Sequence, residues 1–431
     1  MRITIIGAGY VGLVTGVGFA LNGHNVVSID RDANKVKQIN QGIPPFYEYS
    51  FKGLLSSCVG ERRTLRATED LSEVSRSDVT FICVGTYSEL DGKTNLDNIV
   101  DVAGKIGCEL RKMDSYHSVT IKSTISPGTT EEIIIPTLEN YSGKKVDKEF
   151  GVAVNPEFLQ EGNAMECFQN PDRIVIGEHD RKVGDILEHL YRDLPFSCPI
   201  IRTNPSVAEM IKYASNAFLA TKISFINQIG NLCKNMGIDV YQVAKGIGYD
   251  PRIGDQFLEA GIGFGGSCLP KDLTELIHKS EQMGLDAQLL KSVLATNTDQ
   301  SLRLVEIAEK RLGDLKDKTI TVLGLAFKPN TDDIRDAPSL RIISQLLERG
   351  ALVKVYDPEA MPRAKKILPG DVDFCPTLAD AIHDSECIVI ATEWNEFKDE
   401  SLYKGKLVID GRRVFDPETA GQLCRYEGIC W

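Results

Sequence analysis

Residues Ile3-Thr4-Ile5-Ile6-Gly7-Ala8-Gly9-Tyr10-Val11-Gly12 decide the first part of the fold. The apolar residues 3–6 predict a buried parallel strand, because they lead directly into G-x-G-x-x-G and are too few for a signal peptide. Residues 13–22 predict a helix, and residues 25–30 predict a second strand that ends on Asp30, eighteen residues past Gly12. Strand, glycine turn, helix and terminal acid together are typical of a dinucleotide-binding unit.

The chemistry of this unit favours NAD over NADP. The glycines allow a tight turn, and the helix that follows would hold a pyrophosphate at its N-terminus. Asp30 can accept hydrogen bonds from the ribose hydroxyls, and its carboxylate repels a 2′-phosphate. Arg31 follows directly and weakens that preference slightly.

The alternation of strands and helices continues beyond this unit. Three further buried strands are predicted, at residues 78–84, 118–124 and 151–154. Polar residues follow the carboxyl ends of these strands, where open α/β sheets bind ligands: Thr86, Thr124, Glu157 and Glu161. A turn or cap role is the alternative for each residue alone. Glu157 and Glu161 would share one face if Pro156 opens a helix.

A long helix is predicted from Val207 to Met236, since the only Gly or Pro in that stretch is Gly230 and apolar residues recur with helical spacing. Such a helix suits a connector between domains. Lys212 and Asn216 would lie on one face of it, although a solvated surface lysine is the simpler interpretation. Residues 285–312 predict a further helix.

The stretch Gly261-Ile262-Gly263-Phe264-Gly265-Gly266-Ser267-Cys268-Leu269-Pro270-Lys271-Asp272 combines four glycines, a cysteine and an aspartate. Pro270 suits the first turn of a helix, which puts Cys268 just before a helix N-terminus that favours the thiolate. Asp272 would lie within reach of the same site. The alternative is a glycine-rich turn with a buried structural cysteine.

A second α/β unit follows residue 313. Strands are predicted at residues 318–325, 351–357, 387–392 and 407–410, with a helix at 339–348. The unit lacks G-x-G-x-x-G, which predicts a Rossmann-like half with a different ligand. Basic residues in its loops suit an anionic phosphate, with solvated side chains as the alternative: Lys328, Arg335, Arg412 and Arg413.

We therefore expect three parts in an α/β protein, two Rossmann-type domains joined by a long central helix. The boundaries are an NAD-binding Rossmann domain at 1–203, a central helical domain at 204–312 and a Rossmann-like domain for another ligand at 313–431.

Composition limits the partners. The 431 residues are 42% hydrophobic and 26% charged with a net charge of −12, which argues against nucleic acid and against anionic membranes. No apolar run approaches the length of a membrane span. The eleven cysteines are scattered without a CxxC pair and the six histidines are dispersed, so we expect a cytoplasmic location and no metal site.

Across essentially the whole chain the sequence resembles the UDP-glucose/GDP-mannose dehydrogenase family, the nucleotide-sugar 6-dehydrogenases. The resemblance is carried by Gly7 to Gly12, Lys122-Ser123-Thr124, Asn155 to Gly162, Lys212-Tyr213-Ala214-Ser215-Asn216, Gly263 to Asp272 and Gly324-Leu325-Ala326-Phe327-Lys328. Asp250-Pro251-Arg252-Ile253-Gly254 is similar to the UDP-glucose branch. The same chemistry on GDP-mannose or a UDP-N-acetylhexosamine is the alternative.

The resemblance implies a four-electron oxidation of the sugar C6 alcohol to a carboxylate with two NAD+, giving UDP-glucuronate for polysaccharide biosynthesis. Cys268 would form a thiohemiacetal and then a thioester. The implied catalytic residues are Cys268, Lys212, Asp272, Asn216, Thr124 and Glu161. Which of Asp272, Glu161 and a water held by Thr124 moves which proton stays open.

The resemblance also implies the binding residues. Those for NAD are Gly7, Gly9, Tyr10, Val11, Gly12, Asp30, Lys35, Thr86, Thr124, Glu161 and Arg335. Those for the substrate are Glu157, Phe158, Leu159, Lys212, Asn216, Arg252, Phe257, Gly265, Lys328 and Arg413. Arg252 would reach the site of a second subunit in a homodimer built around the long helix.

Two rival functions need fewer of these residues. A catalytically silent nucleotide-sugar sensor on the same fold would not need Cys268, Lys212 and Asp272. A two-electron dehydrogenase of the 6-phosphogluconate or hydroxyacid type would not need Cys268.

Overall fold

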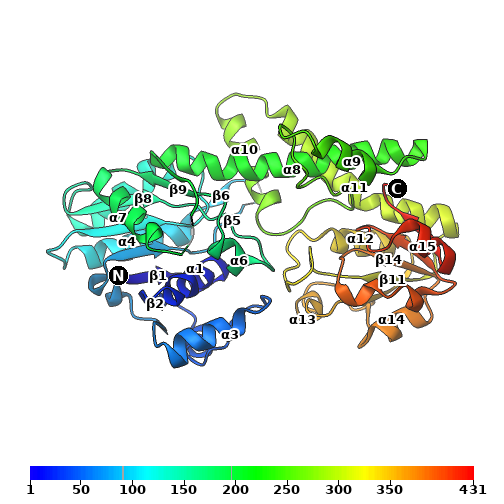
Figure 1. Cartoon of the computed structure of the whole chain (residues 1–431), viewed down its shortest axis with the longest axis horizontal. Coiled ribbons are helices and arrows are strands. Elements are labelled where there is room, and N and C mark those ends of the chain that lie inside the picture. Colours follow the sequence, from blue (N-terminus) through cyan, green and yellow to red (C-terminus); the bar gives the residue numbers. More distant parts are fainter. Residues whose placement is uncertain (90–91, 196) are drawn as a thin grey trace. The chain divides into compact units, whose positions relative to one another are not determined.

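The computed structural model describes residues 1–89, 92–195 and 197–431. The chain divides into two compact units, Met1–Ser215 and Asn216–Trp431. Each unit is built around its own sheet (Figure 1).

The first unit holds an eight-stranded sheet in the order β10-β9-β8-β7-β4-β1-β2-β3. Its strands are β1 Arg2–Ile6, β2 Asn25–Ile29, β3 Leu65–Thr68, β4 Val79–Ile82, β7 His117–Ile121, β8 Phe150–Val154, β9 Ile174–Glu178 and β10 Ile200–Thr203. A small hairpin, β5 Tyr87–Ser88 and β6 Thr94–Asn95, lies outside the sheet. Neighbouring strands are parallel except β8 and β9, which are antiparallel.

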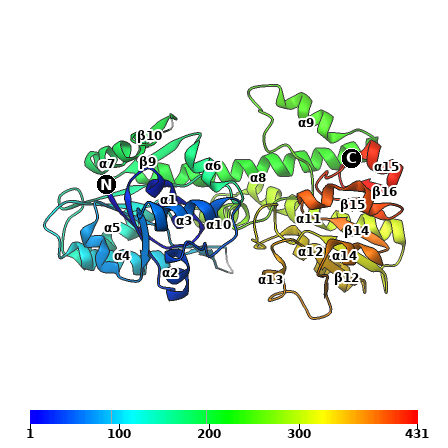
Figure 2. The same ribbon diagram turned by 60° about the horizontal axis from the view of Figure 1, so that its bottom comes forward.

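The central strands of this sheet are buried on both sides, because helices cover both of its faces. The helices are α1 Tyr10–Leu21, α2 Ala33–Asn40, α3 Phe51–Ser56, α4 Asp97–Leu110, α5 Ile135–Ser142, α6 Ala164–Gln169 and α7 Arg181–Arg192. Apolar residues of α1, α3, α6 and α7 form one core cluster, and those of α4 and α5 belong to another. Helices α4 and α5 lie side by side (Figure 2). The order of the strands reverses between β1 and β4, which is where such sheets bind nucleotides.

Helix α8, Pro205–Met236, is a single helix of 32 residues that crosses the boundary between the units. The prediction of one long helix at this place is confirmed. Its one internal glycine has a packing reason, since a Cβ at Gly230 would lie 2.7 Å from Cβ of Cys430. The glycine therefore lets another segment of the second unit approach the helix backbone.

The second unit adds a six-stranded sheet in the order β13-β12-β11-β14-β15-β16, with all neighbouring strands parallel. Its strands are β11 Thr319–Leu323, β12 Leu352–Tyr356, β13 Asp373–Phe374, β14 Cys387–Ile390, β15 Leu407–Asp410 and β16 Arg425–Gly428. Its helices after α8 are α9 Val240–Gly248, α10 Leu269–Gln282, α11 Gln288–Leu312, α12 Pro338–Glu348, α13 Met361–Ala364, α14 Leu378–His383 and α15 Pro417–Leu423. Figure 2 shows α11 and α12 side by side.

The strand order of the second sheet again reverses once, between β11 and β14. Both sheets are therefore of the Rossmann type, and the predicted α/β fold with two such sheets and a long central helix is confirmed.

Candidate active site

The glycine turn after β1 has the geometry that a bound pyrophosphate requires. Gly7 has φ of +100°, and a Cβ there would lie 2.7 Å from the carbonyl oxygen of Cys83. A Cβ at Gly12 would lie 1.9 Å from the carbonyl oxygen of Gly7, so helix and strand approach each other closely. By contrast, the space beside Gly9 is open within 4 Å, and no side chain caps α1 at this residue. The first turn of α1, with Val11, thus presents its N–H groups to an open cradle that fits the phosphates of NAD.

Asp30 lies directly after β2, beside this turn. Its Oδ2 accepts a 2.9 Å hydrogen bond from the Ala8 N–H and lies 3.7 Å from Nζ of Lys35. The carboxylate is therefore fixed next to the cradle, at the carboxyl end of β2. Tyr10 points elsewhere, because its hydroxyl donates to Glu48 Oε2 at 2.6 Å.

Thr86 and Thr124 are brought together at the carboxyl ends of β4 and β7. The hydroxyl of Thr86 donates to the carbonyl oxygen of Thr124 at 3.0 Å. Two residues that the sequence singled out separately, 38 positions apart, therefore share one edge of the sheet.

Lys212 of α8 forms an ion pair with Glu157, which follows β8. Nζ of Lys212 lies 3.0 Å from Oε1 of Glu157, and both side chains are buried, at 5% and 7% exposure. Burial alone would raise the pKa of Glu157, but the Lys212 ammonium and the other donors outweigh it, so this pKa lies below its ordinary value. The interpretation of Lys212 as a solvated surface lysine is therefore wrong.

Two cations lie close to the Phe158 ring. Nζ of Lys212 is 5.4 Å from the centre of the Phe158 ring, and the guanidinium of Arg173 is 3.9 Å from it. Arg173 also donates to Ser215 Oγ at 3.2 Å. No local signal marks Arg173, since an isolated arginine in a loop matches no motif.

The prediction that Pro156 opens a helix carrying Glu157 and Glu161 is wrong. Residues 155–160 form neither helix nor strand, and the next helix, α6, begins at Ala164. The Glu157 carboxylate accepts the N–H of Leu159 at 2.6 Å, which ties the chain into a local turn in place of a helix. The Glu48 carboxylate accepts the N–H groups of Gly162 and Ala164, at 2.7 and 2.8 Å. It therefore caps the N-terminus of α6, which begins at Ala164.

Cys268 is the N-cap of α10, and Pro270 lies in the first turn, as the sequence predicts. The Cys268 side chain is exposed, with Sγ 3.5 Å from Ser267 Oγ, so a buried structural cysteine is ruled out here. Asp272 lies one turn further and is buried. Its Oδ2 accepts a 2.6 Å hydrogen bond from Asn216 Nδ2, and its Oδ1 lies 2.6 Å from Nζ of Lys271.

The glycine-rich loop before Cys268 is closely packed against other backbone. A Cβ at Gly265 would lie 2.5 Å from the carbonyl oxygen of Asp336, and one at Gly266 would lie 2.9 Å from the Phe327 ring. Gly266 also donates its N–H to the carbonyl oxygen of Arg335 at 2.8 Å. No larger residue fits at either glycine unless the neighbouring segment, residues 327–336, moves away.

Three buried amide side chains hold the same loop, and none of them was predicted from the sequence. Asn297 Oδ1 accepts the Phe264 N–H at 2.7 Å, and Asn297 Nδ2 donates to the Phe264 carbonyl at 2.9 Å. Asn227 accepts the Gly261 N–H at 2.8 Å, and Gln300 donates to the Gly261 carbonyl at 2.8 Å. Polar residues inside long helices carry no motif, so only their burial could have marked them.

The basic residues of the second unit lie in two loops, residues 324–337 after β11 and residues 411–416 after β15. Arg335 pairs with Asp333, and Arg413 pairs with Asp239 through two contacts of 3.0 and 2.9 Å. Nζ of Lys328 lies 5.4 Å from the centre of the Phe327 ring.

Two predicted substrate residues precede the glycine-rich loop. The Arg252 side chain is 87% exposed and pairs with Asp250. Phe257 is half-buried and has φ of +62°, an uncommon value for a residue with a side chain.

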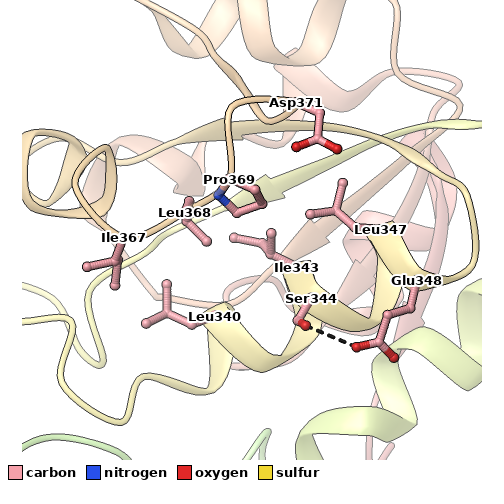
Figure 3. A pocket seen from close by; sticks show the side chains of 9 residues that line it. All are labelled: Leu340, Ile343, Ser344, Leu347, Glu348, Ile367, Leu368, Pro369 and Asp371. Atoms are coloured by element: carbon pink, nitrogen blue, oxygen red, sulfur yellow. Dashed lines mark hydrogen bonds between the residues drawn. The ribbon is translucent and has the colours of Figure 1, made fainter.

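The second unit also has a hollow of about 430 Å³, which is lined by none of the predicted site residues (Figure 3). It lies between α12 and the segment that follows α13, and its lining is mainly apolar: Leu340, Ile343, Leu347, Ile367, Leu368 and Pro369. The polar side chains around it are Ser344, Glu348 and Asp371, and Ser344 donates to Glu348 at 3.2 Å. Since it contains no basic side chain, this hollow does not suit a diphosphate.

Sequence models of the UDP-glucose/GDP-mannose dehydrogenase family match three parts of the chain: the NAD binding domain at residues 1–195, the central domain at 206–299 and the UDP binding domain at 321–417. The chain is 43% identical to UDP-glucose 6-dehydrogenase YwqF of Bacillus subtilis (strain 168), covering 97% of this chain and 95% of that protein.

Two solved structures are similar over the whole chain. A UDP-glucose dehydrogenase from Pyrobaculum islandicum is 40% identical with a TM-score of 0.94, covering 100% of this chain and 98% of that chain. A UDP-D-ManNAc dehydrogenase from Pyrococcus horikoshii is 30% identical with a TM-score of 0.86, covering 100% of this chain and 99% of that chain.

The open cradle at α1, the fixed Asp30 and the two Rossmann-type sheets define an NAD-dependent dehydrogenase. The chain belongs to the UDP-glucose/GDP-mannose dehydrogenase family. None of the helices in the described ranges is both long and apolar enough to cross a membrane.

Proposed function

We propose that the protein oxidises the C6 alcohol of UDP-glucose to a carboxylate and so produces UDP-glucuronate. The observation that carries this proposal is the exposed Cys268 at the N-terminus of α10, one turn before the buried Asp272. A simple alcohol dehydrogenase needs no thiol, whereas an oxidation that proceeds to the acid needs a nucleophile that holds the aldehyde. The relatives named as UDP-glucose dehydrogenases, at 43% and 40% identity, support this sugar.

The cysteine would act on the aldehyde that the first oxidation yields. NAD+, when bound, accepts one hydride in each of the two oxidations. The Cys268 thiolate adds to the C6 carbonyl carbon, and the carbonyl oxygen takes up a proton to give a thiohemiacetal. Loss of hydride and of that proton leaves a thioester. Water then adds at C6 and the C–S bond breaks, which releases the carboxylate and returns the thiol.

We assign the other polar groups of the motifs by their charge. The Lys212 ammonium would stabilise negative charge on the C6 oxygen, with the Asn216 amide as a further donor. Asp272 and a water held by Thr124 would transfer protons during the oxidations, and Glu161 would act as base for the hydrolysis.

The binding roles follow the same proposal. Phe158, Leu159, Phe257 and Gly265 would surround the sugar and the uridine, with Glu157 fixing Lys212. Lys328 and Arg413 would meet the diphosphate, and Arg335 would contact an anionic phosphate of the cofactor. Under the same proposal the chain has three parts: an NAD-binding domain at 1–203, a central dimerisation domain at 204–312 and a UDP-sugar domain at 313–431.

We propose a homodimer, with Arg252 reaching the partner subunit. Support comes from the part of α8 that belongs to the second unit, where apolar side chains are exposed in one row: Phe218 at 65%, Phe225 at 50%, Leu232 at 57% and Met236 at 63%. The first three are spaced by seven residues, which keeps them on one face of the helix. Exposed Arg252 would otherwise have only Asp250 as its charged partner in the part of the chain that the structure describes.

A cytoplasmic location and a place in polysaccharide biosynthesis complete the proposal. Seven of the eleven cysteines are buried within the two units, as expected of structural thiols in a reducing compartment.

The same chemistry on a UDP-N-acetylhexosamine is the second candidate, favoured by the 30% identity to the Pyrococcus UDP-D-ManNAc dehydrogenase. The test is a panel of UDP-glucose, UDP-N-acetylmannosamine and GDP-mannose, with NADH and acid both quantified. Two NADH per UDP-glucose are expected. One NADH per sugar would indicate a two-electron dehydrogenase, and binding without turnover would indicate a sensor, so either result contradicts the proposal.

A further inference from the structure

Asp410 organises the loop that carries Arg412 and Arg413. It is fully buried at the carboxyl end of β15. Its Oδ1 accepts the Arg412 N–H at 2.8 Å, and its Oδ2 accepts the N–H groups of Val414 and Phe415 at 2.7 and 3.3 Å. One carboxylate thus binds three backbone donors and folds residues 411–415 around itself. The loop contains Arg413 at φ of +54°, so its shape depends on these contacts.

Two side chains, Trp431 and Tyr426, connect the surface of the unit to this carboxylate through hydrogen bonds. The Tyr426 hydroxyl of β16 lies 2.9 Å from Asp410 Oδ2, and the Trp431 indole Nε1 lies 3.0 Å from the same hydroxyl oxygen. An indole N–H can only donate, so it occupies an acceptor position of the hydroxyl. The hydroxyl hydrogen is then directed to Asp410. The indole is itself held in place, because it lies directly over Gly428, where a Cβ would come within 2.0 Å of Nε1.

The loop that Asp410 folds places Arg412 over the point where the strand order of the sheet reverses. Arg412 Nε donates to the Ala391 carbonyl just after β14, at 3.2 Å, and its Nη2 donates to the Phe327 carbonyl beyond β11, at 3.3 Å. Ligands of such sheets bind outside the carboxyl ends of the two strands at that point. The side chain also passes close to the glycine-rich loop, since a Cβ at Gly261 would lie 3.7 Å from its Nη1.

We propose that Tyr426 and Trp431 are positioning residues for nucleotide-diphosphate binding, acting through Asp410 on the Arg412–Arg413 loop. The proposal rests on the proposed function only in taking a nucleoside diphosphate as the ligand of the second unit. Neither ring needs to touch that ligand. Loss of the Tyr426 hydroxyl leaves Oδ2 of Asp410 with only its backbone donors and loosens the basic loop.

The experiment measures UDP binding to the full-length protein by calorimetry for Tyr426→Phe, Trp431→Phe and the double variant. Tyr426→Phe should weaken UDP binding about tenfold, as expected when a hydrogen bond to a charged group is lost. Trp431→Phe should weaken it about threefold, since the hydroxyl can then turn toward the Phe415 carbonyl, 3.5 Å away. The Arg413 guanidinium lies over the Trp431 ring, 5.2 Å from its centre, and Trp431→Phe keeps an aromatic ring for that contact. The remaining effect of Trp431 then runs through Tyr426, so the double variant should bind no more weakly than Tyr426→Phe.

Tyr403→Phe is the matched control, because the Tyr403 hydroxyl is also buried in this unit but donates to the Phe397 carbonyl at 3.0 Å. It should bind UDP like the wild type, and NAD+ binding should be unchanged in every variant. Wild-type affinity in Tyr426→Phe, an equal loss in Tyr403→Phe, or losses that multiply in the double variant would each overturn the proposal.

The same titrations with GDP separate this proposal from the proposed function. If the wild type binds GDP and not UDP, UDP-glucose is the wrong substrate, and the effect of Tyr426→Phe on GDP binding decides the positioning role. If the wild type binds UDP and Tyr426→Phe has no effect, the positioning role fails and the substrate stands. Binding of neither nucleotide would refute both.

Discussion

Asn216 donates a 2.6 Å hydrogen bond from its side-chain amide to Oδ2 of Asp272. Both side chains are buried, and Oδ1 of Asp272 lies 2.6 Å from the Lys271 ammonium. The Asp272 N–H donates to the Cys268 carbonyl at 2.9 Å, so the carboxylate lies one helical turn beyond the thiol. Helices α8 and α10 therefore fix the orientation of the acid before any substrate binds.

Replacing Asp272 with Asn should lower kcat for UDP-glucose about a hundredfold while the KM changes little, because the variant keeps the shape of the side chain and removes the charge. Steady-state kinetics check this. Asp286→Asn, at a side chain 72% exposed, is the control and should retain activity. A change confined to KM would contradict a role in the chemical steps.

Cys268→Ser should abolish acid formation and leave UDP-glucose binding intact, because a serine hydroxyl is a far weaker nucleophile than a thiolate at neutral pH. The measurement combines product analysis with calorimetry. Cys108, an exposed cysteine of α4, offers a matched control, and Cys108→Ser should remain active. Wild-type acid formation in Cys268→Ser would rule out the thioester route.

The buried ion pair of Lys212 and Glu157 predicts a strong coupling in stability. Either Lys212→Met or Glu157→Gln should lower the free energy of unfolding by about 3–5 kcal/mol, because the remaining charge stays buried. The double variant should lose less than the sum of the two. The melting temperatures of the wild type, the two single variants and the double variant, together with hydrogen exchange at β8, measure this coupling. Additive losses of stability would show that the two charges act independently.

His117 predicts a loss of stability in weak acid. Its ring is buried in β7, with Nε2 2.8 Å from Thr80 Oγ1 and Nδ1 3.2 Å from the Ser77 carbonyl, and burial lowers its pKa to about 4. The unfolded chain binds this proton near pH 6.5, whereas the folded chain binds it only near pH 4, so the free energy of unfolding falls as pH decreases across that window. The expected loss is about 2–3 kcal/mol. The pH dependence of denaturant unfolding checks it, and His117→Phe should remove this contribution; an unchanged pH profile in the variant would contradict it.

Phe225→Asp should convert the proposed dimer into a monomer, because a buried charge in the apolar row on α8 is costly without a partner. Light scattering with size-exclusion chromatography measures the mass. Leu402→Asp, at another exposed leucine of the second unit, should leave the mass unchanged. A wild type that is already monomeric at micromolar concentration would refute the dimer itself.

Much of the fold was predictable because it is encoded locally. The turn from Gly7 to Gly12, the N-cap at Cys268 and the length of α8 each depend on residues that are neighbours in sequence. Pro156 does not open the helix that its position suggests. The Glu157 side chain accepts the Leu159 N–H, and this local contact stabilises a turn in place of a helix.

The missed residues share a different property, because their partners are distant in sequence. Glu48 binds Gly162 and Asn297 binds Phe264, contacts separated by 114 and 33 residues. Each is a single polar side chain with an ordinary role available on a surface. Only the folded chain shows that it is buried and supports a loop of the site.

The unbroken helix α8 also constrains how the length of this chain can vary. Its first turns supply Ala208 to a core cluster of the first unit, and later turns supply Ala220 and Ile226 to clusters of the second. Deleting one residue between Ala208 and Lys212 would turn the Lys212 side chain by about 100° away from Glu157, and a deletion between Asn216 and Ala220 would turn Asn216 away from Asp272 in the same way. Insertions and deletions in these two stretches should therefore be selected against, and differences in length among related enzymes should accumulate in loops.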